Sequence, residues 1–197
     1  YLRDIVCRDT QLAMGQPSTH GAYCHLFLNG QYWGLANTQE RAEADFAAAY
    51  FGGAAADYDV VKVDWGSFTL YATDGDMAGW TELYDRIQAG VSTEAAYQRL
   101  LGNNPDGTRN PAFPIYLDAD NLIDFMLITI FTANLDSAIS TFSGRPNNWY
   151  AIRPRDGRAG FRFLVHDAEF TMLNVNADRT SSPSNAGDAS VLDSSPE

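Results

Sequence analysis

The sequence has 197 residues, of which 45% are hydrophobic and 13% aromatic, enough for one domain with a substantial core. Its formal net charge is −12 at pH 7, from 25 acidic and 13 basic residues, which disfavours nucleic acid or an anionic membrane as the main partner, because both are bound through Lys and Arg clusters. No run approaches the roughly 18 apolar residues of a membrane span, and the only cysteines, Cys7 and Cys24, are consistent with either one bridge or two buried thiols.

The first part of the chain predicts two helices, a hairpin and a strand. Residues 1–15 place apolar residues at helical spacing before a glycine and a proline. Residues 21–39 predict a hairpin, because two alternating aromatic runs flank Asn29-Gly30, a dipeptide that favours a tight turn. Residues 39–53 predict a helix that ends at paired glycines, and residues 58–64 predict a short buried strand.

The middle of the chain is mainly helical in pattern. Residues 74–90 form a strongly amphipathic segment with acidic residues at its start, and residues 93–102 predict a shorter helix. Residues 103–114 have the Asn, Pro and Gly content of a loop. Residues 118–136 predict the most apolar helix, which we expect at the centre of the core.

The last part predicts a second hairpin and a tail. Strands are expected at residues 149–153 and 161–166, joined by a turn at residues 155–157. The chain then becomes rich in Ser, Asp, Asn and Pro, a composition that cannot bury enough apolar surface to become ordered. We therefore expect an α+β domain over residues 1–175 and a flexible polar tail over residues 176–197.

Polar side chains stand where several apolar elements end. Asp136 follows the most apolar helix, Asn147 and Asn148 open the second hairpin, and Asp167 and Glu169 end its return strand. A hairpin brings its open ends together, so we expect Asn148 and Asp167 to be neighbours. Carboxylate and amide oxygens suit Mg²⁺ or Mn²⁺, and a further aspartate could accept a hydroxyl proton, as in kinases. Solvated caps and turns explain the same residues, and that alternative stays open.

Other residue groups suggest different chemistry. His166, Asp167 and Glu169 could hold a metal in a hydrolase, although zinc sites need three converging ligands. Three of the tryptophans, Trp33, Trp80 and Trp149, are expected in the core, whereas Trp65 could be exposed. The arginines of the second hairpin suggest a positive face, which is either a solvated turn or a docking patch near the metal; they are Arg153, Arg155, Arg158 and Arg162.

Five stretches, taken in order, carry a resemblance to a known family: RDTQLAMGQPSTHGAYCHLFLNGQYWGLANTQER (8–41), DGDMAGWTEL (74–83), LDADNLIDFMLITIFTANLD (117–136), NNWYAIR (147–153) and GFRFLVHDAEFT (160–171). Together they resemble the spore-coat-protein-H (CotH) kinase family, a group of atypical bacterial protein kinases. The succession N-x-D, N-N-W-Y and D-x-E is fairly specific as a set.

The resemblance implies a fold and a site. The fold would be protein-kinase-like, mostly the C-terminal lobe with β-hairpins and a helical core, and with the N-terminal lobe incomplete. Asp136 would be the catalytic aspartate. Asn148 and Asp167 would bind the metal, with Glu169 as an additional ligand or a partner of the ligands. Residues 35–40 would line the nucleotide pocket, with Asn37 and Glu40 as the binding residues.

The implied activity is transfer of the γ-phosphoryl group of ATP to Ser or Thr of a protein substrate, with Mg²⁺ or Mn²⁺, by a secreted or cell-surface bacterial protein. Three features depart from a kinase. SAISTFSGRP separates Asp136 from Asn147, the only lysine is Lys62 in a strand after the hairpin, and no glycine-rich phosphate loop is visible. These departures favour an alternative, a non-catalytic surface or adhesion module of the same fold; a metal-dependent hydrolase is a weaker one.

Overall fold

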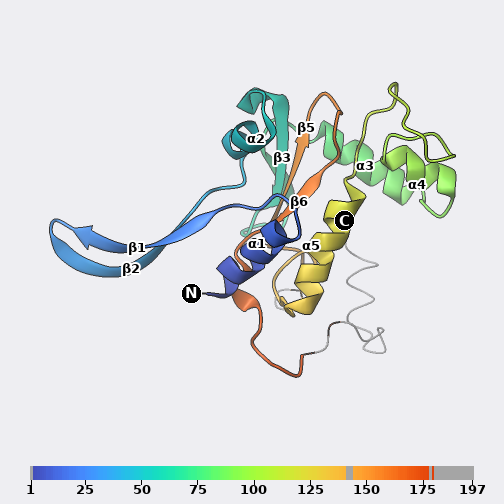
Figure 1. The fold of residues 1–197 in the computed structure, drawn as a ribbon. Coiled ribbons are helices and arrows are strands. Elements are labelled where there is room, and N and C mark those ends of the chain that lie inside the picture. Colours follow the sequence, from blue (N-terminus) through green and yellow to red (C-terminus); the bar gives the residue numbers. More distant parts are fainter. Residues whose placement is uncertain (1, 141–143, 178, 180–197) are drawn as a thin grey trace.

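Two antiparallel sheets organise the protein in this computed structural model, which describes residues 2–140, 144–177 and 179 (Figure 1). In the described part of the chain, one sheet is a two-stranded hairpin and the other has four strands in the order β4-β3-β5-β6. The chain is therefore α+β, as its pattern predicts, and this fold is consistent with a kinase-like domain. The strands are β1 Gly21–Leu28, β2 Gln31–Gln39, β3 Tyr58–Val63, β4 Leu70–Asp74, β5 Trp149–Pro154 and β6 Arg162–Val165.

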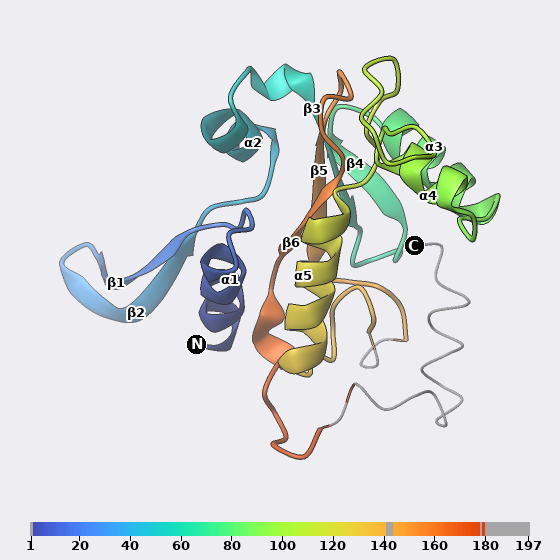
Figure 2. The same ribbon diagram turned by 45° about the vertical axis from the view of Figure 1, so that its right-hand side comes forward.

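The helices follow the predicted order with shorter ends. Helices α1 and α5 lie side by side along β6, and the 45° turn keeps them so (Figures 1 and 2). Capping explains two of the starts, because Thr93 accepts a hydrogen bond from the Ala96 amide and Asp118 accepts one from the Asn121 amide. The helical elements are α1 Arg3–Ala13, α2 Ala44–Phe51, α3 Ala78–Gln88, α4 Glu94–Leu100 and α5 Ala119–Phe131, with 3₁₀ turns η1 Ala55–Asp57 and η2 Ala168–Phe170.

The four-stranded sheet has a hydrophobic core on each face, because successive side chains of a strand point to opposite faces. The first core joins Trp149 of β5 and Val61 of β3 to residues of α1, α3 and α5. The second joins Tyr150 and Val60 to α2 through Phe46. Strands β3 and β5 thus contribute alternate side chains to both cores.

Side chains seal the free edge of β6. The Gln11 amide of α1 donates to the Phe163 carbonyl (2.8 Å) and accepts from the Val165 amide (3.0 Å). The Asn121 side chain of α5 accepts from the Phe163 amide (2.5 Å). An exposed edge would leave unpaired backbone groups, so these two buried amides replace a missing strand and fix the course of β6 towards Asp167.

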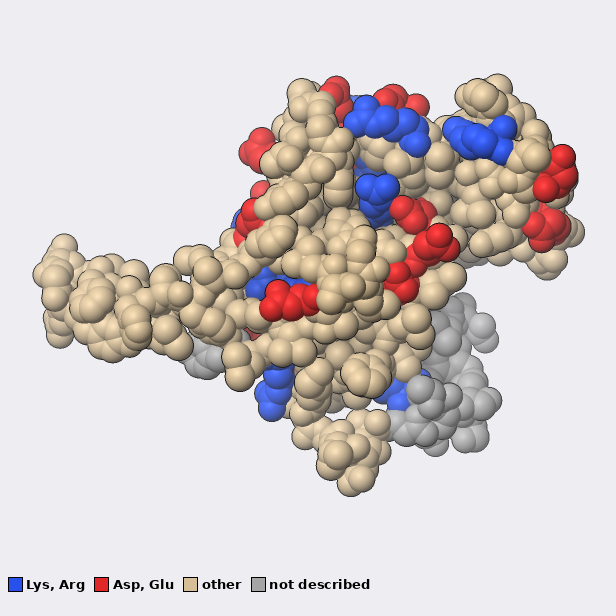
Figure 3. Space-filling view, in the orientation of Figure 1, with Lys and Arg blue, Asp and Glu red and all other residues tan. Residues whose placement is uncertain are grey.

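The β1–β2 hairpin projects away from the rest of the protein (Figure 1). It contains no Lys, Arg, Asp or Glu, and the projecting arm is uniformly tan in the charge-coloured surface (Figure 3). Its exposed apolar side chains include Trp33 (68% exposed) and Phe27 (57%). The expectation that Trp33 lies in the core is wrong, because both faces of this two-stranded ribbon face solvent.

Several other expectations are confirmed and a few are corrected. Trp80 and Trp149 stack in the core with ring centroids 5.5 Å apart, and Trp65 is 75% exposed. Strand β4 was not expected. Helix α5 ends at Phe131 and buries one face only, since Ile123, Leu127 and Phe131, spaced four residues apart, are all exposed. Both cysteines are free thiols, Cys7 being buried.

Two features of the whole chain complete the description. Within the described residues, no helix combines the length and apolar character needed to cross a bilayer. Almost all of the predicted flexible tail, residues 176–197, lies outside the described residues, so that interpretation stays a prediction.

Candidate functional site

Three distant points of the chain meet at one end of the four-stranded sheet. Asp136 lies beyond the end of α5 and is only 5% exposed. Asn148 directly precedes β5 and Asp167 follows β6, and these ends adjoin because Trp149 pairs with Val165. The Asn148 amide nitrogen donates to Asp136 Oδ2 (3.0 Å) and to the main-chain oxygen of Asp167 (3.4 Å). The expected proximity of these residues is therefore present.

The segment inserted after Asp136 does not displace it from Asn148. Ser140 Oγ donates to Asp136 Oδ1 (3.1 Å), and the Asn147 amide nitrogen lies 3.4 Å from Oδ1 and 3.3 Å from Oδ2. The backbone amide of Asn147 donates to the Ser137 carbonyl (3.0 Å), which closes the loop at its base. Asn147 and Ser140 thus hold the carboxylate in one orientation.

Asn148 and Asp167 share an uncommon backbone conformation. Their φ angles are 55° and 48°, in the left-handed region. Asn and Asp tolerate this region better than other residues with a Cβ atom, and such conformations persist where the surroundings hold them, often at functional sites. Two of the three residues that the sequence selects for the metal, Asn148 and Asp167, are therefore held in unusual turns.

The carboxylates around Asp167 repel one another. Partial burial raises the pKa of Asp167 above its ordinary value, and the negative charges of Glu169, Asp4 and Asp136 raise it further. Glu169 lies in η2 and is exposed. A bound cation would relieve this repulsion.

The residues expected to hold Mg²⁺ or Mn²⁺ fit such an ion in composition. They are Asn148, Asp167 and Glu169. Among the described residues, no three or more His, Cys, Asp or Glu side chains are arranged to hold a metal, so a site here would depend on the Asn148 amide as well as on carboxylates. Within the described residues, Asn148 contacts Asp136 and Asp167 through its side-chain nitrogen, so its Oδ1 atom could bind a ligand.

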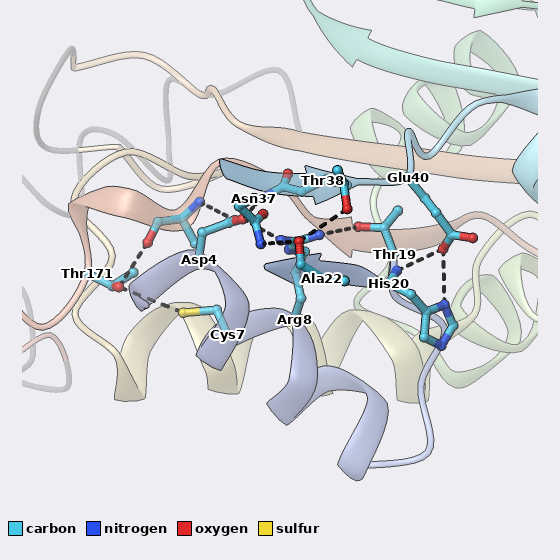
Figure 4. Close-up of polar contacts among 12 residues, drawn as sticks. Asp4, Cys7, Arg8, Thr19, His20, Ala22, Asn37, Thr38, Glu40 and Thr171 are labelled. Carbon is cyan, nitrogen blue, oxygen red and sulfur yellow. Dashed lines mark hydrogen bonds and ion pairs between the residues drawn. The ribbon is translucent and has the colours of Figure 1, made fainter. Parts of the chain in front are cut away.

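Asp4 of α1 is a site residue that the sequence pattern did not select. Its Oδ1 accepts from the Ala168 backbone amide (2.9 Å), while Oδ2 pairs with Arg8 (2.8 Å) and accepts from Gln39 of β2 (2.6 Å). Asp4 thereby ties α1 and the hairpin to the turn after Asp167 (Figure 4). The signal available in the sequence was its spacing of four residues from Arg8, which allows an ion pair on one helix face, but apolar spacing alone did not reveal its burial.

Asn37 and Glu40, the expected nucleotide-binding residues, lie along β2 and just after it. Asn37 donates to the Ala22 carbonyl (3.4 Å). Glu40 accepts from the backbone and ring nitrogens of His20 (Figure 4). It also accepts from the Tyr50 hydroxyl. Although desolvation opposes it, these hydrogen bonds lower the Glu40 pKa. Within the described residues, neither side chain is hydrogen-bonded to Asp136, Asn148 or Asp167, so their role stays a prediction.

His166 lies between charged groups of both signs. Burial lowers its pKa to about 4, and the positive charges of Lys62 and Arg41 lower it further while Asp4 opposes them. The ring packs edge-on against Tyr150, with centroids 4.9 Å apart. In the part of the chain that is described, His166 does not join Asp167 and Glu169 in a metal-holding group.

The arginines of the second hairpin do not form one open positive face. Arg153 is 5% exposed and donates to the Ile115 carbonyl (2.9 Å). Arg155 pairs with Asp59 and Asp76, and Arg162 pairs with Asp118 (3.0 Å). Of the two interpretations left open, a solvated turn or a docking patch, these contacts disfavour the docking patch, because Arg155 and Arg162 are already paired with carboxylates.

Two comparisons with known proteins bear on this arrangement. A family model described as CotH kinase protein matches residues 1–194 of the chain. A search of curated proteins finds no match.

Proposed function

Because the chain belongs to the CotH kinase family, we propose that it is a metal-dependent protein kinase domain that transfers the γ-phosphoryl group of ATP to Ser or Thr of a protein. Family membership supports a kinase-like domain. The observation that carries the more specific proposal is the convergence of Asp136, Asn148 and Asp167 at one end of the sheet.

Asp136 is assigned the catalytic role. Its carboxylate is held by Ser140, Asn147 and Asn148, so it can orient an acceptor hydroxyl and take its proton without first reorganising. Positioning of this kind and electrostatic stabilisation supply most of the rate in phosphoryl transfer.

Asn148, Asp167 and Glu169 are assigned to the cation. A bound Mg²⁺ or Mn²⁺ would neutralise charge on the β- and γ-phosphates. Asp4 fixes the turn that carries Asp167 through the Ala168 amide, and Asn148 joins that turn to Asp136. The chain's own residues therefore hold the proton acceptor Asp136 and the metal ligands at fixed positions relative to one another.

The proposal also includes a location and a partner. Since the family is related to the spore coat, we place the protein outside the cytoplasm, secreted or on the cell surface. Its substrate would be a protein with an accessible Ser or Thr.

The test is phosphoryl transfer from labelled ATP to a protein acceptor by the wild type and by Asp136→Asn and Asp167→Asn. We expect Asp136→Asn to lose about 100-fold or more of the rate, the usual size of a general-base contribution. Transfer should require a divalent cation, and Asp167→Asn should lose this metal-dependent transfer because it removes a metal ligand. Asp85→Asn removes an exposed carboxylate of α3 and should leave the rate unchanged. Undiminished transfer by both site variants would show that the roles are wrongly assigned.

The projecting hairpin favours one alternative function. Its uncharged surface exposes Trp33, Phe27 and Tyr32, which suits a binding module. If the wild type transfers no phosphate to any acceptor with either cation, yet binds a partner that Trp33→Ser and Phe27→Ser variants do not bind, the non-catalytic module is the better assignment.

A further inference from the structure

Two cations converge on one tyrosine hydroxyl beside the candidate site. Lys62 Nζ of β3 lies 3.3 Å from the Tyr150 hydroxyl oxygen, and Arg41 Nη2 lies 3.4 Å from the same atom. Tyr150 is completely buried, whereas the Arg41 side chain is 67% exposed and Lys62 is half-buried. The pair of cations, Lys62 and Arg41, is therefore held by the buried Tyr150 hydroxyl on its inner side and is accessible to solvent on its outer side.

The charges of this pair are incompletely balanced. Arg41 uses Nε to pair with Glu43 (2.9 Å), but within the described residues no carboxylate lies at ion-pair distance from Lys62. Two like charges sharing one neutral oxygen repel each other. The Tyr150 oxygen accepts from both cations, and its own proton has no acceptor among the described residues. An anion at this point would balance the cations and could accept the hydroxyl proton.

The pair lies on the same end of the sheet as the candidate metal ligands. Lys62 pairs with Tyr150 in the β3–β5 register, and Tyr150 lies two residues after Asn148. The His166 ring packs on Tyr150 and is followed directly by Asp167. A group bound by Lys62 and Arg41 would thus lie beside the carboxylates in a chain whose net charge is −12.

From this geometry we propose that Lys62, Arg41 and the Tyr150 hydroxyl form a phosphate-binding site, which takes the polyphosphate chain of a nucleotide. The nucleotide in this statement rests on the proposed function, whereas the phosphate site stands on the contacts above. Charge-assisted hydrogen bonds from Lys and Arg are the usual means of holding phosphate. Lys62 would then supply a positive charge from a strand that follows the hairpin.

Lys62 is the only lysine in the sequence, which makes a direct test possible. The full chain is treated with an amine-reactive acetylating reagent, and acetylation of Lys62 is measured by peptide mass spectrometry. The probes are inorganic triphosphate and ATP, each without metal and with Mg²⁺. We expect millimolar triphosphate to slow acetylation of Lys62 by about tenfold or more. The reason is that a triphosphate held by charge-assisted hydrogen bonds would cover the Lys62 amine.

Variants separate the site from general charge effects. Arg41→Gln should reduce the protection of Lys62 about tenfold, the scale of one charge-assisted hydrogen bond. Arg158→Gln removes one positive charge at the opposite end of the β5–β6 hairpin and should leave protection unchanged. In direct titration with triphosphate, Lys62→Met should bind about tenfold or more weakly, and Lys62→Arg should recover part of the affinity.

The outcomes distinguish this site from the proposed function. Protection by triphosphate in the wild type and in Asp136→Asn supports the site even if no phosphoryl transfer is found. Protection by triphosphate but not by ATP also supports a phosphate site and assigns it to free polyphosphate. Protection by ATP alone, or acetylation unchanged by either probe, overturns the site even if transfer is found.

Discussion

At the scale of single residues, Asp59 of β3 is a buried carboxylate away from the candidate site. It is 3% exposed, accepts from the Asp76 backbone amide (3.0 Å) and lies 3.3 Å from Arg155 Nε. Desolvation raises its pKa above 3.8, the nearby charge of Asp76 raises it further, and the hydrogen bond and Arg155 only partly offset them. Burial therefore outweighs pairing at this position.

The raised pKa of Asp59 predicts a pH dependence with a definite sign. Between its unfolded and folded pKa values the native state binds more protons than the unfolded state, so this residue's contribution to stability falls as pH rises above 3.8. The slope is at most about 1.4 kcal/mol per pH unit for one proton. We expect the free energy of unfolding of Asp59→Asn, relative to that of wild type, to increase as the pH rises above 3.8. Urea unfolding at successive pH values measures this difference.

Direct titration provides the check on that prediction. The carboxyl carbon of Asp59, followed by NMR, should titrate with a midpoint above 3.8. A midpoint below that value would show that Arg155 and the Asp76 amide outweigh burial, and the predicted slope would then have the opposite sign.

At the scale of elements, α1 buries mainly polar side chains. Its buried residues are Asp4, Cys7, Arg8 and Gln11, while Leu2 and Val6 are exposed. The stripe follows helical spacing, so the helix itself could be predicted, but the face that it buries could not. Burial of the stripe depends on partners that are distant in sequence, namely β2, β6 and the turn after Asp167.

This inverted stripe predicts a large effect from one substitution in α1. Asp4→Ala leaves Arg8, which is 2% exposed, without its carboxylate, and losing one partner of a buried pair costs about 3–5 kcal/mol. We expect the free energy of unfolding to fall by that amount in denaturant titrations. Asp9→Ala, at an exposed position of the same helix, should change it by less than about 0.5 kcal/mol. Equal effects from the two variants would contradict the assigned role of the stripe.

At the scale of the whole molecule, local pattern predicted both hairpins, the helices and the end of the sheet where Asp136, Asn148 and Asp167 meet. These features follow from turn dipeptides, alternation and helical spacing, which act over a few residues. Strand β4 could not be predicted because LYATD mixes apolar and polar residues without a regular pattern, and because the strand has a neighbouring strand on one side only. Trp33 was misplaced because its strand looks like a core strand, and only the tertiary arrangement shows that nothing in the described chain covers it. The cluster of Lys62, Arg41 and Tyr150 joins three separate segments, so no local pattern could reveal it.

The two cores share β3 and β5, so they should unfold together. Phe46→Ala empties part of the α2 core, where Phe46 is 6% exposed, and such truncations cost about 3–5 kcal/mol. The near-ultraviolet circular dichroism of the Trp80–Trp149 stack reports on the other core. Because Trp149 and Tyr150 are adjacent in one strand, we expect that signal to be lost at the same lowered denaturant concentration as the far-ultraviolet signal.

Phe131→Ala is the matched control for this coupling, because Phe131 is 85% exposed at the end of α5. Its truncation should leave the free energy of unfolding, measured by either signal, within about 0.5 kcal/mol of wild type. If Phe46→Ala instead shifted only part of the far-ultraviolet transition and left the tryptophan signal at its wild-type midpoint, the α2 core would unfold separately. Shared strands would then be insufficient to couple the two faces of the sheet. A coincident shift would mean that a substitution in the core beside α2 also destabilises β5, the strand that Asn148 directly precedes.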